Sequence, residues 1–182
     1  MPPPKRGILD RRRNPDYDLR LYLYQLTGVD LTQIDGINAL TAQTVITEVG
    51  LNMHAWPTVK HFTSWLGLAP YQNISGGKVL SSRTKRSNNR ANTALRIAAQ
   101  SLAHSQSPLG HYYRRLRARH GPAKAITATA HKLARIIYHM LKHQQPFDPN
   151  KLERNQQQLQ QRRLKQLRKQ AEHFGFKLVE TT

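Results

Sequence analysis

Cysteine is absent from the sequence, which excludes disulfide bonds, cysteine-ligated zinc and thiol catalysis. Long apolar runs are absent too. No stretch reaches the roughly eighteen residues that a transmembrane helix needs, so none is expected. The N-terminal segment is rich in proline and arginine and lacks the apolar core of a secretory signal. The absence of disulfide bonds fits a reducing compartment and does not prove it.

Acidic residues are scarce. Asp and Glu together number 10 against 29 Lys and Arg, which gives a formal net charge of +19. Between Glu48 and Asp148 there is no acidic residue, whereas Lys and Arg recur throughout that interval. A solvated globular surface usually mixes both signs, so this imbalance indicates a polyanionic partner. Nucleic acid is the first expectation; a membrane surface and a merely soluble basic face are the alternatives.

Apolar residues recur with helical spacing along most of the chain. The periodicity predicts a mainly α fold: a helix over 17–26, a helix-hairpin-helix at 31–50, and a small helical domain with a short basic loop or hairpin. Helices are expected over 58–66, 88–105, 108–120 and 123–143, and an extended C-terminal helix over 150–173. The helix over 123–143 is the most apolar and should be the centre of the core.

Changes of composition divide the chain into four parts. We expect a disordered basic leader at 1–16, a helical linker at 17–30, a main domain at 31–148, and a basic Gln-rich helical extension at 149–182. The apolar stripe of that extension is thin. It should therefore protrude, form a coiled coil, or become ordered on nucleic acid.

Gly36 lies between the two predicted helices of the helix-hairpin-helix. A glycine there would let the backbone approach a phosphate closely, and the N-terminus of the following helix would favour the negative charge. Contacts of this kind position DNA without reading its sequence. An ordinary helix pair with a glycine turn is the competing interpretation.

The segment 74–78, Ile-Ser-Gly-Gly-Lys, is the strongest candidate for chemistry. Ser75 stands beside two glycines, on backbone that could come close to a phosphodiester. Cations that could stabilise added negative charge follow at once: Lys78, Arg83, Lys85, Arg86 and Arg90. No Ser-His-Asp spacing is evident, so a turn serine without chemistry is the competing interpretation. Ser64, Ser81, Ser82 and Ser87 offer competing hydroxyls.

Two other patterns carry weaker signals. His139 and His143 have metal-ligand spacing on one helix face, but no carboxylate lies near them in sequence, and we predict no metal site in this chain. Tyr112 and Tyr113 could stack on bases, although core packing is the commoner role at helical spacing. His131 should pack or contact phosphate.

Taken in order, several segments resemble the C-terminal domain of insertion-sequence transposases of the "one-ten" family, the bridge-RNA-guided recombinases. The resembling segments are 34–37 with 41–42, 65–70, 75–78, 85–90 and 130–135. Each is a modest signal, but together in this order they are specific. The resemblance adds Ile37, Lys132 and Arg135 to the expected nucleic-acid contacts, beside Gly36, Gly76, Gly77 and the cations above.

The resemblance implies that Ser75 forms a covalent link to DNA during strand exchange. It also implies a structured non-coding guide RNA, DNA at the element ends and target, and dimers that pair into tetramers. Full-length members carry a RuvC-like domain whose four acidic residues bind Mg²⁺. A cytoplasmic, nucleoid-associated bacterial protein would fit this function.

This chain shows no recognisable RuvC-like pattern, so we expect a truncated, decayed or split copy that binds no cofactor itself and is inactive alone. The competing interpretations are a non-catalytic DNA- or RNA-binding remnant and a structural RNA-binding protein of the ribosomal sort.

Overall fold

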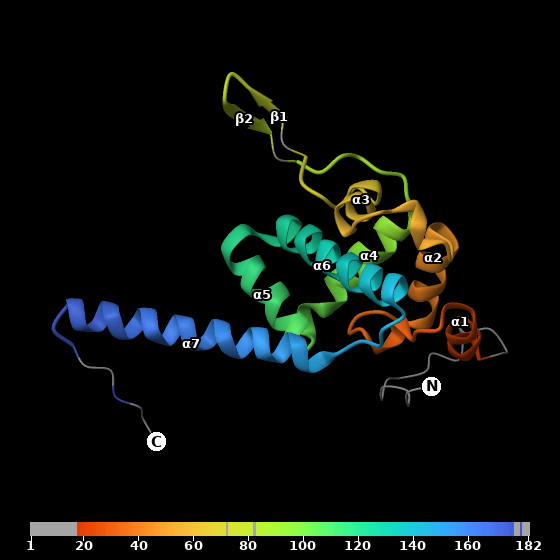
Figure 1. Cartoon of the computed structure of the whole chain (residues 1–182). Helices are drawn as coiled ribbons and strands as arrows, with labels where there is room; N and C mark the ends of the chain where they lie inside the picture. The colour runs from red at the N-terminus through yellow and green to blue at the C-terminus, as the bar shows by residue number, and fades with distance from the viewer. Residues whose placement is uncertain (1–17, 72, 82, 177–178, 180–182) are drawn as a thin grey trace. The chain divides into compact units, whose positions relative to one another are not determined.

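The chain is mainly helical, as the periodicity predicts (Figure 1). The computed structural model describes residues 18–71, 73–81, 83–176 and 179. The predicted basic leader at 1–16 lies outside the described residues. The chain divides into two units, residues 1–147 and 148–182, and each is treated by itself below.

The first helix of unit one, α1, spans Leu19–Thr27. The Asp18 carboxylate accepts from the Leu21 N–H at its start, and Gly28 ends it in the left-handed conformation. Leu19 and Leu23 are buried, whereas Tyr22 and Leu26 of the same predicted apolar face are exposed. The helix therefore packs through a narrower stripe than its sequence predicts.

A buried ion pair joins α1 to the next element, the three-residue 3-10 helix η1 (Leu31–Gln33). Arg20 donates from Nε to Asp30 Oδ2 over 3.0 Å, and Thr32 and Gln33 also donate to that carboxylate. Burial alone would raise the pKa of Asp30. The hydrogen bonds from Arg20, Thr32 and Gln33 outweigh it and lower that pKa.

Helix α2 (Ala39–Val49) follows η1 after a short turn at Gly36. Asn38 begins it, because its side-chain oxygen accepts from the Thr41 N–H over 2.8 Å. The apolar side chains of the segment predicted as a helix-hairpin-helix at 31–50 form one buried face: Ile34, Ile37, Ala42, Val45, Ile46 and Val49.

The next two elements are η2 (Met53–Ala55) and α3 (Val59–Trp65). Aromatic rings pack them against the C-terminal part of helix α6 (Pro122–His143). The Phe62 ring lies 5.3 Å from the Trp56 ring and 5.5 Å from the Tyr138 ring. The Tyr138 hydroxyl donates to the carbonyl oxygens of Trp56 and Pro57, 3.1 Å away in each case. The helix expected over 58–66 is confirmed, and Thr58 caps it because its hydroxyl accepts from the His61 N–H.

Helices α4 (Arg90–Ser101), α5 (Pro108–His120) and α6 (Pro122–His143) complete the core, with the 3-10 helix η3 (Leu102–His104) between the first two. Asn89 caps α4 and Ser107 caps α5. Gly121 separates α5 from α6, which pack against each other as a helical hairpin. Helix α6 lies against α3, α4 and α5 and is the centre of the core, as predicted.

Unit two consists of helix α7 (Pro149–His173) and the residues after it. Asp148 caps α7 by accepting from the Asn150 N–H over 2.9 Å. Leu164 and Leu167 of its thin apolar stripe are exposed. A long helix with such a polar surface gains little from its own packing.

Candidate nucleic-acid interface

A two-stranded hairpin carries Ser75 away from the helical part of unit one (Figure 1). Strands β1 (Asn73–Ser75) and β2 (Lys78–Ser81) pair antiparallel, with Ser75 opposite Lys78 and Ile74 opposite Val79. Gly76 and Gly77 form the turn with φ values of +55° and +74°. Two positive φ values in succession are what a tight two-residue hairpin requires, and they explain the pair of glycines.

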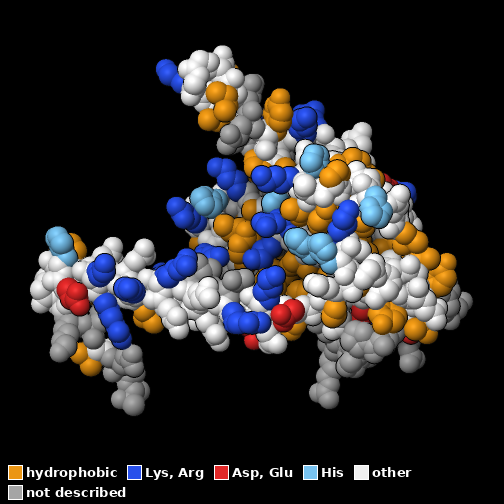
Figure 2. Space-filling view, in the orientation of Figure 1, with side chains coloured by type: hydrophobic (Ala, Val, Ile, Leu, Met, Phe, Trp, Pro, Cys, Tyr) orange, Lys and Arg blue, Asp and Glu red, His pale blue; other side chains and the backbone are white. Residues whose placement is uncertain are grey.

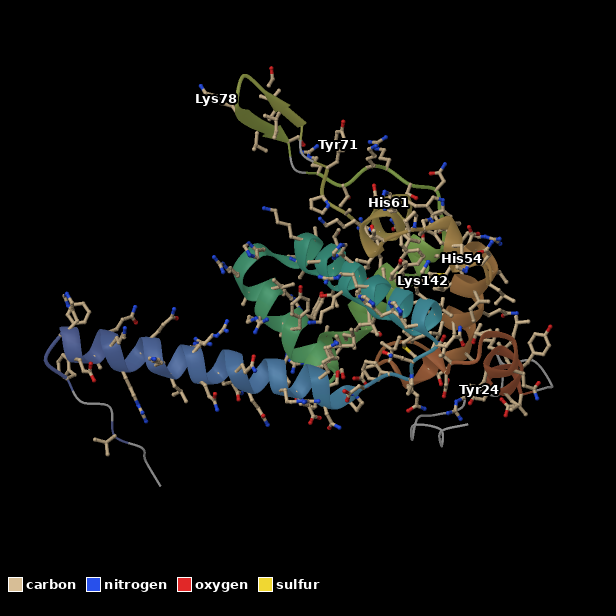
Figure 3. The ribbon with its side chains drawn as sticks, viewed as in Figure 1. Tyr24, His54, His61, Tyr71, Lys78 and Lys142 are labelled. Carbon is tan, nitrogen blue, oxygen red and sulfur yellow. The ribbon has the colours of Figure 1, made fainter. Side chains whose placement is uncertain are left out.

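Ser75 is exposed, and no hydrogen bond between described residues involves its hydroxyl. Its cross-strand neighbour Lys78 is also exposed at the tip of the hairpin (Figure 3). A Cβ atom added at either turn glycine would meet nothing within 4 Å. Substrate could therefore reach Ser75 freely, but no described carboxylate or imidazole is hydrogen-bonded to the serine to take its proton.

Further cations lie at the base of the hairpin, in the segment 83–86 that follows β2. Tyr71 donates its N–H to the Arg83 carbonyl oxygen over 3.2 Å, and the Lys85 ammonium lies 4.7 Å from the Tyr71 ring centroid. Arg83, Lys85 and Arg86 are exposed. These side chains could contact phosphates that follow a strand from Ser75 toward α4.

Arg90 differs from the other cations predicted around Ser75, because it already has a protein partner. It forms an ion pair with Glu48 and so joins the start of α4 to α2. Its own side chain remains largely exposed. The pairing gives Arg90 a structural role that spacing in the sequence could not show, since 42 residues separate the partners.

The backbone at Gly36 packs closely against helix α4. Gly36 has φ +84°, and a Cβ there would lie 2.8 Å from the Ala98 carbonyl oxygen. Ile37 has a buried side chain, and its N–H donates to the Ile34 carbonyl oxygen over 3.1 Å. Packing therefore explains this glycine without a ligand. A phosphate contact by Gly36 or Ile37 stays a prediction.

Lys132 and Arg135 lie on α6, where the half-buried Lys132 and the exposed Arg135 are joined by Tyr112 and Arg115 of α5. The Lys132 ammonium lies 4.5 Å from the Tyr112 ring centroid, and the Arg115 guanidinium carbon lies 5.6 Å from it. Figure 2 shows Lys and Arg side chains gathered over this part of the molecule. Sequence reasoning named Tyr112 but missed Arg115. The i, i+3 spacing of 112 with 115 and of 132 with 135 could have shown both pairs.

Crowded cations and burial shift the titration of this cluster. Burial lowers the pKa of Lys132, and Arg115 and Arg135 lower it further. Burial lowers the pKa of His131 too, with a smaller contribution from Arg135. Burial raises the pKa of the Tyr112 hydroxyl against the opposing effect of the two arginines. The cluster therefore holds positive charge at a cost to the free protein.

Several other cations have structural roles. Arg114 donates to the carbonyl oxygens of Ala103 and Ser105, and Lys142 donates to that of Met53 over 3.2 Å. The imidazole rings of His139 and His143 stack 5.6 Å apart. Within the described ranges, no three His, Asp or Glu side chains lie close enough together to hold a metal ion, and the carboxylate set of a RuvC-like site is not present among them.

A search for membrane spans among the described residues finds no helix that is both long and apolar enough. Among curated proteins, none matches this chain. The sequence pattern described as "Transposase IS116/IS110/IS902 family" matches residues 30–114. That match runs from η1 through α2, α3, the hairpin and α4 into α5, and so contains both Gly36 and Ser75. The chain therefore carries a domain of the IS116/IS110/IS902 transposase family.

Proposed function

We propose that this chain is the DNA-binding and catalytic-serine half of an insertion-sequence transposase. The observation that carries the proposal is the position of Ser75, exposed at the end of β1 beside a tight glycine turn and opposite Lys78. The family match supports a role in DNA transposition or recombination, with DNA as the substrate.

The chemistry would be a transesterification at a DNA phosphodiester. The Ser75 oxygen forms a bond to phosphorus while the bond from phosphorus to one deoxyribose oxygen breaks. The serine proton passes to a base, and the departing deoxyribose oxygen gains a proton to become a hydroxyl. Lys78 and the cations at the base of the hairpin would stabilise the charge that builds on the phosphate oxygens. Strand exchange reverses these steps with another hydroxyl.

Ser75 needs a proton acceptor, and its described surroundings provide none. We therefore propose that the chain works together with a RuvC-like domain, in an assembly of more than one copy and with a guide RNA that selects the DNA sites. These features come from the resemblance to the family. Binding without chemistry is the second candidate function, and the high positive charge favours it independently.

A covalent-adduct assay tests the proposal. Purified protein is incubated with labelled DNA spanning the element ends, the neighbouring non-coding RNA and magnesium, and then run on a denaturing gel. A second lane adds a full-length relative that lacks its own serine. Ser75→Ala should abolish the shifted band completely, while Ser81→Ala, which removes another hydroxyl of the same hairpin, should keep it.

The lanes separate the two candidate functions. A band only in the supplemented lane, lost in Ser75→Ala, would show a recombinase half that needs its partner domain. Intact DNA binding without a band in any lane would contradict the nucleophile and leave a nucleic-acid-binding remnant.

A further inference from the structure

Four side chains of the α5–α6 hairpin form one cluster, which we call the Tyr112 cluster: Tyr112, Arg115, Lys132 and Arg135. Its members come from both helices, and the Tyr112 ring has the Lys132 ammonium 4.5 Å and the Arg115 guanidinium 5.6 Å from its centroid. Tyr112 and Lys132 are half-buried, whereas both arginines are exposed. The arrangement therefore has a partly desolvated centre and open, charged edges.

The cluster has no negative partner within the part of the chain that the structure describes. None of the ion pairs or hydrogen bonds there involves the side chain of Arg115, Lys132 or Arg135. Nearby cations do have partners, since Arg114 donates to two carbonyl oxygens. Three like charges held together without a counter-charge repel each other, and the free energy of that repulsion is recovered when an anion binds.

We propose that the Tyr112 cluster binds phosphodiester groups of a nucleic-acid backbone, as a second contact point away from the Ser75 hairpin. The inference rests on the proposed function for the class of ligand, and on the geometry of α5 and α6 for the site. Figure 1 shows the hairpin projecting from the helical part of unit one, whereas the cluster lies on α5 and α6, so the two contact points belong to different elements.

Each residue has a distinct role in this site. The two exposed arginines present planar guanidinium groups, which can donate two hydrogen bonds to one phosphate. Lys132 adds a third positive charge, close enough to both arginines to interact with them electrostatically. Tyr112 is a positioning residue, because its ring holds the Lys132 ammonium through a cation–π contact and limits the conformations of that long side chain. The ring itself is not required to stack on a base.

Salt dependence of binding tests the site directly. Each lost phosphate contact should lower the slope of log affinity against log salt by about 0.9 for duplex DNA and about 0.7 for single strands. Full-length protein carrying Ser75→Ala, in which no covalent chemistry can contribute, is titrated against labelled duplex DNA and single-stranded RNA at several salt concentrations. Adding Arg115→Gln and Arg135→Gln together should reduce the duplex slope by about 1.8.

Arg117→Gln is the matched control. It removes one exposed arginine from the same helix, but two residues along an α-helix correspond to about 200° of rotation away from Arg115. The control should leave the slope within about 0.3 of the unsubstituted value. Circular dichroism and the thermal midpoint of every variant establish that the fold is retained.

Tyr112 has its own paired test. Tyr112→Phe retains the ring and should bind like the unsubstituted protein, whereas Tyr112→Leu should weaken binding about threefold through loss of the cation–π contact. Rescue by phenylalanine separates a role of the ring from one of the hydroxyl.

The outcomes are decisive. Equal slopes for the double-arginine variant and the Arg117→Gln control, with both nucleic acids, would overturn the site. A loss with DNA alone or RNA alone would support it and identify the source of the phosphates. Because the assay measures equilibrium binding without Ser75, the site and the proposed nucleophile can fail separately.

Discussion

The α2–α4–α5–α6 core and the β1–β2 hairpin follow opposite rules, although both belong to unit one. On the core side, Leu133, Ala134 and Ile137 of α6 are completely buried. On the hairpin, Ile74, Val79 and Leu80 are 54%, 56% and 64% exposed. An isolated two-stranded hairpin is marginally stable in water, so the hairpin needs either its anchored base or a partner to stay ordered.

The difference separates the residues that stabilise the fold from the serine proposed as nucleophile. Buried apolar side chains hold the helices, and the nucleophile candidate lies on a segment that adds almost nothing to that packing. Exposed segments held by a rigid base are common positions for binding and catalytic residues. Substitution of Ser75 should therefore abolish the proposed covalent adduct without unfolding the protein, whereas substitutions in the core should lower the free energy of unfolding.

The largest expected effect is on the free energy of unfolding, and it contrasts a buried isoleucine of the core with an exposed one of the hairpin. Ile137→Ala on α6 should lower the free energy of unfolding by about 3 kcal/mol, because it leaves a cavity in a close-packed core. Ile74→Ala on β1 should change it by less than about 0.5 kcal/mol. Urea titration of both variants measures the difference, provided that their m values agree. Comparable losses would show that the hairpin is part of the cooperative unit.

Glycines give a sharper comparison, because the same change can be made in both regions. Gly36→Ala should cost about 2–3 kcal/mol, since its φ is +84° and the new Cβ would meet the Ala98 carbonyl oxygen at 2.8 Å. Gly76→Ala also has positive φ but open space around it, so its cost should be about 1 kcal/mol and confined to the hairpin.

Urea titration should therefore show a lower midpoint for Gly36→Ala and an unchanged midpoint for Gly76→Ala. Amide hydrogen exchange should be faster in the hairpin of Gly76→Ala only. A midpoint for Gly36→Ala equal to that of the unsubstituted protein would mean that the turn relaxes away from α4, which would leave Gly36 free for the phosphate contact that the sequence predicts.

Much of the fold could be predicted from local pattern. The helices expected over 58–66, 88–105 and 123–143 and the central place of α6 all follow from short-range spacing and turn chemistry. Family resemblance added the transposase domain, and the match over residues 30–114 confirms it.

Contacts between distant residues could not be predicted. Nothing in the local sequence pairs Arg90 with Glu48, or places the Gly36 turn against the Ala98 carbonyl oxygen. Tyr22 and Leu26 fit the apolar period of α1 but are exposed. The helical period predicts which residues share one face of a helix, but it does not predict which other element covers that face. The Tyr112 cluster needs two helices to meet, so its four members are separate signals in sequence.

The smallest expected effect is the pH dependence of stability, which should involve His131 in the helical core and not the hairpin. The pKa of His131 lies below its ordinary value, chiefly through burial, with Arg135 adding to the shift. The unfolded chain then binds this proton at a higher pH than the folded protein does. Stability should accordingly fall as the pH drops from about 7 through the ordinary pKa near 6.5 toward the lowered one, by less than about 1 kcal/mol for this half-buried ring.

Thermal midpoints at pH 7.5 and 5.5 measure the loss of stability, and His131→Asn should reduce that loss. Hydrogen exchange in the hairpin, corrected for its intrinsic pH dependence, should not change over the same interval, because strands β1 and β2 contain no histidine, aspartate or glutamate. An equal pH dependence in His131→Asn would place the responsible proton on another group.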